Sequence, residues 1–469
     1  PRIVETVANT ELGPDTDLEV GGLNIRENDN LLACTRGGEL WEMDSDSGEW
    51  TRLTDSLHQT LGVWTEGDDI WVMQKPELTR LVDDSEAPGI DMYETVCDEF
   101  GISGDYHEFA FGPVRDSDGN FYVNLNLGAQ VGGPLTDVMV YTAPYRGWCL
   151  KVTPDGECEP FASGYRSPAG IGINDDDELF YSDNQGDWVP VCHISHVEEG
   201  EFYGHPHSLG PRDDFPDYEN LDGVDIDDVN ATRKPPAVWV PYNLAQSTGG
   251  VTFEESGNFG PFEGQAFYTD QNKANVSRMY IEEVNGSYQG ATFPFTDIGD
   301  LQCGALREEF TNDGTSLYVG ETNRGWSGGP WSEPYGIERI DYDGSTIPFE
   351  MQSIEIMESG FRVTFTKPAE SAAGESGSWN VSRWTYNYHA EYGSDRVNET
   401  SIDSSDVTAS TNDGDDVVEL ELPNVGPAEY DQARTVHGRV YAIEADGISA
   451  QDGSEMSNTV GYYTVNEVP

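Results

Sequence analysis

The stretch "FAFGPVRDSDGNFYVNLN" (109–126) contains an apolar alternating run, a turn of Asp, Gly and Asn, and a second short apolar run. Alternation predicts strands, and a turn of this composition between two such runs predicts a hairpin. The same kind of unit recurs at 22–44, 62–83, 170–188, 250–272 and 308–326. Six units over three quarters of the chain give about 50 to 60 residues each, the size of a four-stranded propeller blade. The sequence therefore predicts an all-β fold with a six-bladed β-propeller at 1–347.

The pattern changes after residue 347. Five spaced strand patterns follow, at 361–370, 384–393, 416–425, 438–447 and 460–469. Short strands at this spacing, with turns between them, predict an immunoglobulin- or fibronectin-like β-sandwich at 348–469. Helical periodicity is nearly absent, and only 86–101 is expected to form a helix, inserted between blades.

Acidic residues dominate the composition. The chain of 469 residues has 87 Asp and Glu against 24 Lys and Arg, a formal net charge of -63. Such a charge opposes compaction in dilute buffer, but at molar salt the Debye length falls to about 3 Å. We therefore expect a halophilic protein, with neither nucleic acid nor an anionic membrane as partner. No apolar run reaches the length of a membrane-spanning helix.

Export is a further expectation. The chain begins at Pro1 without a methionine, consistent with removal of an export signal, which predicts an extracellular or cell-surface protein. Glycosylation is possible at five sequons: Asn230, Asn275, Asn285, Asn380 and Asn398.

The six cysteines include no CxxC pair, so neither a zinc ribbon nor a thioredoxin-type motif is present. Cys149 and Cys158 flank a predicted hairpin and would lie on one face as diagonal neighbours. One disulfide between these two residues is expected, with free buried thiols as the alternative.

Polar residues recur at one phase of the repeat, just after the second strand of a unit and in the loop before the first. Loops at this phase gather at one mouth of a propeller channel. The candidates are His107 with Glu108, Asn124 and Asn126, and the segments 165–168, 182–188, 245–250, 269–272, 303–307 and 322–326. Three arginines are among them: Arg166, Arg307 and Arg324. Guanidinium groups bind carboxylate or ketone oxygens, so we expect a polyanionic or quinone ligand; the alternative is pairing with an acidic residue of the next blade.

Longer motifs carry a resemblance to a known family. The segments "YHEFAFGPVRDSDGNFYV" (106–123), "YRSPAGIGI" (165–173), "SDNQGDWVPVCHISHVEEGEFYGHP" (182–206) and "TNRGWSGGPWSEPYGIERIDYDG" (322–344) resemble the glucose/sorbosone dehydrogenase-like propellers of the soluble quinoprotein type. The branch often fused to haem-binding domains is the most similar, and the resemblance extends through "GYYTVNEVP" (461–469).

The resemblance implies pyrroloquinoline quinone and Ca²⁺ as cofactors. It implies that His107, with Glu108 beside it, takes the proton from the substrate hydroxyl, a task suited to a neutral imidazole. The calcium loop would consist of Asp183, Asn184, Gln185, Gly186 and Asp187, and the ion would polarise the quinone. Arg166 and Ser167 match the quinone contact, and the other cofactor-binding candidates are Asn124, Asn126, Gln246, Asp270, Gln271, Arg307, Asn323 and Arg324.

The chain departs from the family pattern at three points. Ala110 and Phe111 stand where the family has Gly and Arg, and Ser167 replaces an Asn. No CxxCH haem segment is present, so electrons would pass to a separate acceptor. The leading hypothesis is an exported, salt-adapted quinoprotein-like oxidoreductase acting on a sugar or another hydroxyl or aldehyde compound. The alternative is a non-catalytic cell-surface propeller that serves as a binding or structural subunit, with the sandwich making contacts to surface proteins or to other copies.

Overall fold

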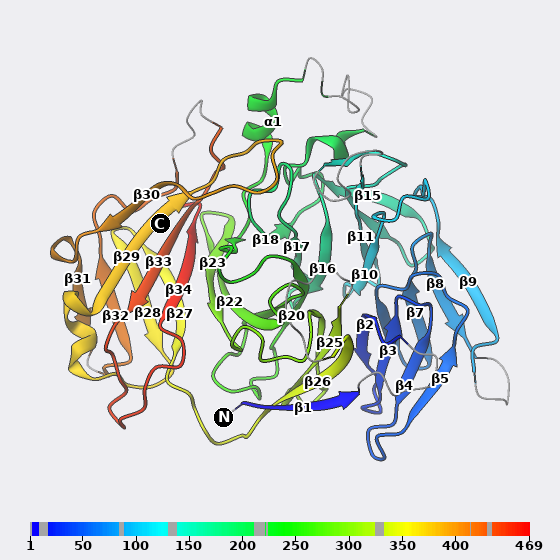
Figure 1. Cartoon of the computed structure of the whole chain (residues 1–469), viewed down its shortest axis with the longest axis horizontal. Helices are drawn as coiled ribbons and strands as arrows, with labels where there is room; N and C mark the ends of the chain where they lie inside the picture. Colours follow the sequence, from blue (N-terminus) through cyan, green and yellow to red (C-terminus); the bar gives the residue numbers. More distant parts are fainter. Residues whose placement is uncertain are drawn as a thin grey trace.

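The computed structural model describes residues 2–8, 17–83, 89–129, 138–210, 221, 224–323, 333–412, 414–428 and 434–469. Strands dominate this part of the chain, so the all-β class is confirmed (Figure 1). None of the helices in these residues is long and apolar enough to cross a membrane.

Six antiparallel sheets form the larger part of the described chain. They consist of β2 (Val20–Ile25), β3 (Leu31–Thr35), β4 (Leu40–Met43) and β5 (Trp50–Thr54); β6 (Val63–Glu66), β7 (Asp69–Met73), β8 (Leu78–Val82) and β9 (Met92–Cys97); β10 (Ala110–Arg115), β11 (Phe121–Leu125), β14 (Trp148–Val152) and β15 (Cys158–Ser163); β16 (Pro168–Ile173), β17 (Leu179–Asp183), β18 (His193–Val197) and β19 (Val238–Trp239); β20 (Thr248–Phe253), β21 (Ala266–Asp270), β22 (Asn275–Val284) and β23 (Ser287–Pro294); and β24 (Ala305–Phe310), β25 (Ser316–Thr322), β26 (Tyr335–Tyr342) and β1 (Arg2–Ala8). A small ribbon of β12 (Gly128–Ala129) and β13 (Met139–Val140) lies in the third unit.

The first strands of these sheets form a ring. β2 contacts β6, β6 contacts β10, and the series continues through β16, β20 and β24 back to β2. The N-terminal strand β1 pairs with β26, so one sheet holds segments from both ends of the ring. This circular arrangement of radial sheets is typical of a β-propeller.

Glycines permit the close packing of the inner strands. A Cβ at Gly62 would lie 1.5 Å from the carbonyl oxygen of Gly112, and one at Gly170 would lie 2.1 Å from that of Gly249. Side chains at these positions would force neighbouring sheets apart, because a backbone carbonyl has no freedom to move away. The ring is therefore narrow at its centre.

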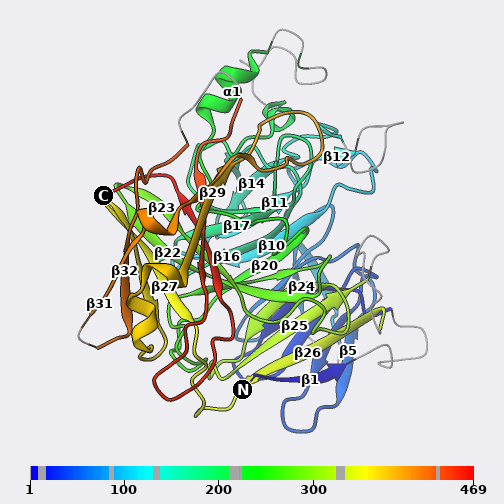
Figure 2. The same cartoon turned by 60° about the vertical axis from the view of Figure 1, so that its left-hand side comes forward.

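The fifth sheet continues into the C-terminal strands. Gly290 of β23 pairs with Thr464 of β34 (Val460–Val465), and the sheet then extends through β33 (Arg439–Ala445), β29 (Trp379–Thr385) and β30 (Val397–Ile402) to eight strands (Figures 1 and 2). A second sheet contains β27 (Met351–Met357), β28 (Gly360–Phe365), β32 (Val417–Glu421) and β31 (Thr408–Thr411). The two sheets share a core in which Phe361 packs between Tyr441 and Tyr463, with ring centroids 5.1 and 5.2 Å away. The C-terminal strands are therefore built onto the propeller.

The predicted helix at 86–101 is wrong for the described residues from 89 onward. Residues Met92–Cys97 form β9, which pairs with β8 at the edge of the second sheet. Free hydrogen-bonding groups at a sheet edge outweigh a weak local helix propensity. The α-helix of the described chain is α1 (Ile226–Thr232). Its N-cap is Asp225, whose side chain accepts hydrogen bonds from the N–H groups of Asp227 and Asp228.

The predicted Cys149–Cys158 disulfide is also wrong. Cys149 lies opposite Ala162 and Cys158 opposite Val152, so the two cysteines are several residues apart along the β14–β15 ladder. Cys158 instead forms a disulfide with Cys97, joining the outer strands of the second and third sheets. The four free cysteines of the described residues are all buried: Cys34, Cys149, Cys192 and Cys303.

Candidate functional site

A cavity of about 310 Å³ lies at the end of the ring where the inner strands β16 and β20 begin. Its walls combine aromatic rings, side-chain amides, one histidine and one arginine, and no carboxylate lines it among the described residues. For a protein with a net charge of -63 this is an unusual surface. Its described lining is Tyr106, His107, Phe109, Phe111, Asn126, Met139, Arg166, Ser167, Ala169, Asn184, Gln185, Tyr242, Gln246, Ser247, Gln271, Asn272, Leu306 and Tyr392.

His107 lies in the loop before β10, and its backbone N–H donates to the carboxylate of Asp105. Its Nδ1 is 3.2 Å from the carbonyl oxygen of Leu127, which can only accept a hydrogen bond. Nδ1 therefore carries the proton and Nε2 is the ring's acceptor atom. The rings of Tyr106 and Phe109 pack against the imidazole at 5.6 and 5.2 Å between centroids.

The surroundings of His107 favour the neutral imidazole. Burial lowers its pKa to about 4, and the positive charge of Arg166 acts in the same direction. At neutral pH the ring is therefore uncharged and its Nε2 can accept a proton.

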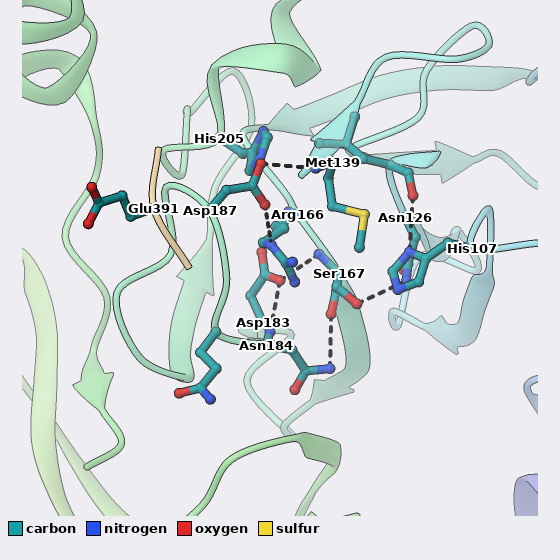
Figure 3. A network of polar contacts seen from close by, with 12 residues as sticks. His107, Asn126, Met139, Arg166, Ser167, Asp183, Asn184, Asp187, His205 and Glu391 are labelled. Carbon is teal, nitrogen blue, oxygen red and sulfur yellow. Dashed lines mark hydrogen bonds and ion pairs between the residues drawn. The ribbon is translucent and has the colours of Figure 1, made fainter. Parts of the chain in front are cut away.

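Arg166 is held by a buried ion pair. Its Nε lies 2.7 Å from Oδ1 of Asp187, and both side chains are almost fully buried (Figure 3). The other oxygen of Asp187 accepts hydrogen bonds from the backbone N–H of Met139 and from Nε2 of His205. Burial opposes ionisation of Asp187, but His205 and Arg166 hold the pKa of the carboxyl well below its usual range. A Cβ at Gly186 would lie 1.9 Å from the guanidinium carbon, so a side chain there would push Arg166 out of its present position.

Two aspartates shape the loops that enter the cavity. The N–H groups of Arg166 and Ser167 donate to the carboxylate oxygens of Asp183, at 2.8 and 2.7 Å. Asp270 accepts backbone N–H groups of 246–247 in the same way in the next sheet. Each aspartate is the last residue of its sheet's second strand. Burial raises the pKa of both carboxyls, that of Asp183 to about 6.

The structure does not support the predicted calcium loop. The carboxylates of Asp183 and Asp187 are occupied by N–H donors, whereas a cation needs free oxygen ligands. No cluster of three or more His, Cys, Asp or Glu side chains suited to a metal ion occurs within the described residues.

Four other predicted site residues lie outside the cavity lining. Glu108 is fully buried, and its carboxylate accepts hydrogen bonds from the N–H and Oγ of Ser103 and from Thr142. The side chain of Asn124 is likewise fully buried and donates to a carbonyl in β16. Asn323 and Asp270 do not line the cavity either, and Arg324 lies outside the described residues.

Arg307 has a role that the sequence did not indicate. Its guanidinium donates to the carbonyl oxygens of Gly21, Ala169 and Leu306 at 2.7, 2.7 and 2.6 Å, and to that of Leu61 at 3.3 Å. These carbonyls belong to the inner strands of four different sheets or lie within two residues of them. Arg307 does not line the His107 cavity, and four of its donors are used within the ring, so these contacts give no support to its predicted assignment to a cofactor.

No protein-family model and no curated protein sequence matches this chain significantly. Among solved structures, a putative oxidoreductase (glucose dehydrogenase) from Thermus thermophilus has a TM-score of 0.52 and 18% identity, covering 72% of this chain and 100% of its own. The PQQ-bound form of an aldose sugar dehydrogenase from Streptomyces coelicolor has a TM-score of 0.51 and 15% identity, covering 73% and 98%.

The chain has the fold of the propeller-type sugar dehydrogenases. A luciferin-regenerating enzyme is similar to it as well, with a TM-score of 0.51 and 13% identity, covering 73% of this chain and 96% of its own. At such identities the likeness concerns the fold, and the reaction has to be argued from the site.

Within this dehydrogenase fold, the cavity gathers eight of the residues singled out by sequence: His107, Asn126, Arg166, Ser167, Asn184, Gln185, Gln246 and Gln271. Their functional roles remain predictions. Sequence reasoning missed the aromatic wall, which includes Tyr106, Phe109, Tyr242 and Tyr392. Tyr106 is adjacent to His107 and could have been included, but nothing in the sequence connects Tyr392 with a loop more than two hundred residues earlier.

Proposed function

We propose that this chain is an exported, salt-adapted oxidoreductase, a six-bladed propeller (1–347) followed by a β-sandwich (348–469). It would oxidise a hydroxyl or aldehyde group of a sugar-like substrate with pyrroloquinoline quinone and pass the electrons to a separate acceptor. The observation that carries the proposal is the neutral His107, with Nε2 as its acceptor atom, in the wall of a cavity lined by no carboxylate of the described chain.

The cavity residues fit a planar, anionic, polar ring system. Arg166 supplies a cation for a carboxylate or ketone oxygen, and the aromatic side chains supply flat apolar surface. The buried Oδ1 of Asn126 has no hydrogen-bond partner within the described part of the chain, although its amide nitrogen donates to Ser167. An unsatisfied buried acceptor needs an explanation, and a ligand N–H or O–H would satisfy it.

Each of these residues has a defined task in this proposal. The quinone, when bound, accepts the hydride equivalent of the substrate. His107 receives the substrate's hydroxyl proton at Nε2, while its Nδ1–H stays on the carbonyl of Leu127 and keeps the ring oriented. Arg166 holds anionic oxygens, and the amides of Gln246 and Gln271 can orient hydroxyl groups. A bound anion would raise the pKa of His107 from about 4 and make it a stronger base.

Export and salt adaptation rest on other features. The Cys97–Cys158 disulfide is typical of proteins outside the cytosol. Of the five sequons, Asn285, Asn380 and Asn398 are exposed and open to glycosylation, whereas Asn230 and Asn275 are buried. The net charge of -63 supports a medium of high ionic strength.

Reconstitution tests the proposal. The protein would be mixed with pyrroloquinoline quinone at molar salt, and dye reduction followed with a panel of aldoses. We expect His107→Ala to lower the rate by about 10²- to 10⁴-fold while the fold is retained, because the proton acceptor is lost. His58→Ala, at an exposed histidine, is the matched control and should leave the rate unchanged. Failure of the wild type to bind the quinone or reduce the dye would favour the non-catalytic alternative, and a His107→Ala rate within a few-fold of wild type would exclude His107 as the base.

A further inference from the structure

Two exposed aromatic side chains flank the His107 cavity. Large hydrophobic residues are seldom exposed in the described chain, yet Tyr242 and Tyr392 are 54% and 47% exposed and both line this cavity. Both also line a second, larger hollow of about 810 Å³ beside it, together with Gln185. The two hollows share these three residues and therefore adjoin each other, and together they form a depression beside His107.

Tyr392 comes from the C-terminal part of the chain. It lies in the loop 386–396 between β29 and β30, which reaches from the C-terminal sheets over the upper end of the propeller (Figure 1). Three backbone hydrogen bonds dock this loop onto 186–190, the segment next to the Arg166–Asp187 pair: Trp188 N–H to His389 O at 2.9 Å, Gly393 N–H to Gly186 O at 3.0 Å, and Ser394 N–H to Pro190 O at 2.8 Å.

Buried contacts hold the base of the same loop. The ring of Tyr388 is fully buried and packs against Trp188 with centroids 5.0 Å apart, and its hydroxyl donates to the carbonyl of Gly204. Figure 3 shows Glu391, on this loop, with its carboxylate directed away from the Arg166 network. The loop is therefore a fixed wall of the depression, and the carboxylate of Glu391 does not line the His107 cavity.

A cation lies near each of the two exposed rings. The guanidinium of Arg166 lies 5.5 Å from the ring centre of Tyr392, and the ammonium of Lys273 lies 5.9 Å from that of Tyr242. Asn243, next to Tyr242, donates to the hydroxyl of Tyr462 at 2.7 Å and accepts from Arg396 at 3.1 Å. Exposed rings fixed in this way cost little conformational entropy when a ligand binds.

The chemistry of the depression selects the class of ligand. Flat aromatic faces bind the apolar faces of sugar rings, and side-chain amides bind their hydroxyl groups. Amides of Gln185, Asn243 and Asn387 line the outer hollow. Its charged lining residues are of both signs, Glu391 and Asp395 against Arg396, so a neutral ligand fits better than a charged one. The outer hollow extends the depression beyond the room needed by one terminal sugar.

We propose that Tyr242 and Tyr392 form an outer sugar-binding subsite, so that the substrate is a neutral oligosaccharide whose terminal unit enters the His107 cavity. This inference rests on the proposed function for the identity of the inner cavity. It assigns the C-terminal sheets a part in substrate recognition.

Calorimetry without quinone, at molar salt, tests the subsite independently of any redox activity. The probes are glucose, maltotriose, cellotriose and laminaritriose. We expect at least one trisaccharide to bind about tenfold or more tightly than glucose, since an aromatic contact contributes on the order of one factor of ten. Tyr242→Ala and Tyr392→Ala should each remove most of this gain, read as the ratio of trisaccharide to glucose affinity within each variant, because both rings also line the inner cavity.

Matched controls separate the ring from its surroundings. Tyr242→Phe and Tyr392→Phe keep the flat faces and should keep the gain. Tyr93→Ala removes an exposed tyrosine on β9, outside the depression, and should change nothing. The subsite is overturned if every trisaccharide binds no more tightly than glucose, if none of the probes binds, or if the alanine variants bind the trisaccharides as the wild type does. A chain-length gain in a protein that reduces no dye would support the subsite and contradict the proposed oxidoreductase.

Discussion

Replacing Arg307 by methionine should destabilise the propeller more than any surface substitution. The side chain lies in the centre of the ring, where its guanidinium also packs 4.8 Å from the ring centre of Phe111 in β10. The guanidinium therefore contacts five sheets at or near their inner strands. Four of these sheets supply the carbonyls, and the fifth supplies Phe111. Methionine fills a similar volume but donates no hydrogen bond.

The expected loss of stability follows from the four carbonyl oxygens that would lose their hydrogen-bond donors. Each hydrogen bond to a charged donor contributes roughly 1.5 to 3 kcal/mol, and three of the four are at 2.7 Å or less. Two effects reduce the total. Burying the guanidinium is costly, as its pKa, lowered by burial to about 10, indicates. A cavity of about 220 Å³ lined by Arg307 itself and the His107 cavity lined by Leu306 and Ala169 leave room for water near some of the carbonyls. We expect a net loss of roughly 3 to 5 kcal/mol, a large part of the stability of an ordinary domain.

Urea unfolding at molar salt, followed by tryptophan fluorescence, measures this loss. Arg362→Met is the matched control: Arg362 is 44% exposed and pairs with Glu419 on the surface, so its loss should cost less than about 1 kcal/mol. Arg307→Lys should fall between the two, because an ammonium reaches fewer carbonyls. Equal midpoints for Arg307→Met and Arg362→Met would refute the structural role. If Arg307→Met were as stable as the wild type but no longer bound the quinone, Arg307 would instead be a ligand-binding residue.

Other predictions concern pH, the disulfide and ions. Burial raises the pKa of Glu308 from 4.5 to about 8. The folded state therefore retains a proton that the unfolded state loses, so the free energy of unfolding falls as pH rises from about 5 to about 8. The melting temperature of Glu308→Gln should rise progressively above that of the wild type over this window. A difference in melting temperature that is the same at every pH would contradict this. The Cys97→Ser/Cys158→Ser variant opens a loop with a sequence separation of 61, and its free energy of unfolding in urea should be lower by about 4 kcal/mol. An unchanged urea midpoint would show that the disulfide adds no stability. Transfer to low salt should unfold or loosen the protein. In circular dichroism melts at fixed ionic strength, Ca²⁺ and Mg²⁺ should stabilise it equally, because the carboxylates of Asp183 and Asp187 already accept hydrogen bonds. Clearly greater stabilisation by Ca²⁺ would support a calcium site.

The sequence by itself determined the all-β class and much of the cavity lining. Units such as 109–126 and 170–188 can be recognised because strand alternation and turn composition are local properties. The phase of the repeat then indicated which residues face one mouth, and it brought His107, Arg166 and Gln246 into the same group although they come from different sheets. A repeated unit places equivalent residues at equivalent positions in space, so this much of a propeller site can be predicted without a structure.

Only the tertiary structure decided what those residues contact. Arg166 and Arg307 are chemically identical, yet one lines the cavity beside Asp187 and the other joins inner strands, because each side chain binds whatever acceptors lie within its reach. Asp183 holds backbone N–H groups rather than a cation for the same reason. Tyr392 reaches the cavity because β23 pairs with β34 and carries the C-terminal sheets to the propeller's side. Pairings between segments so distant in the chain depend on packing of the whole fold, which local patterns of charge and hydrophobicity do not encode.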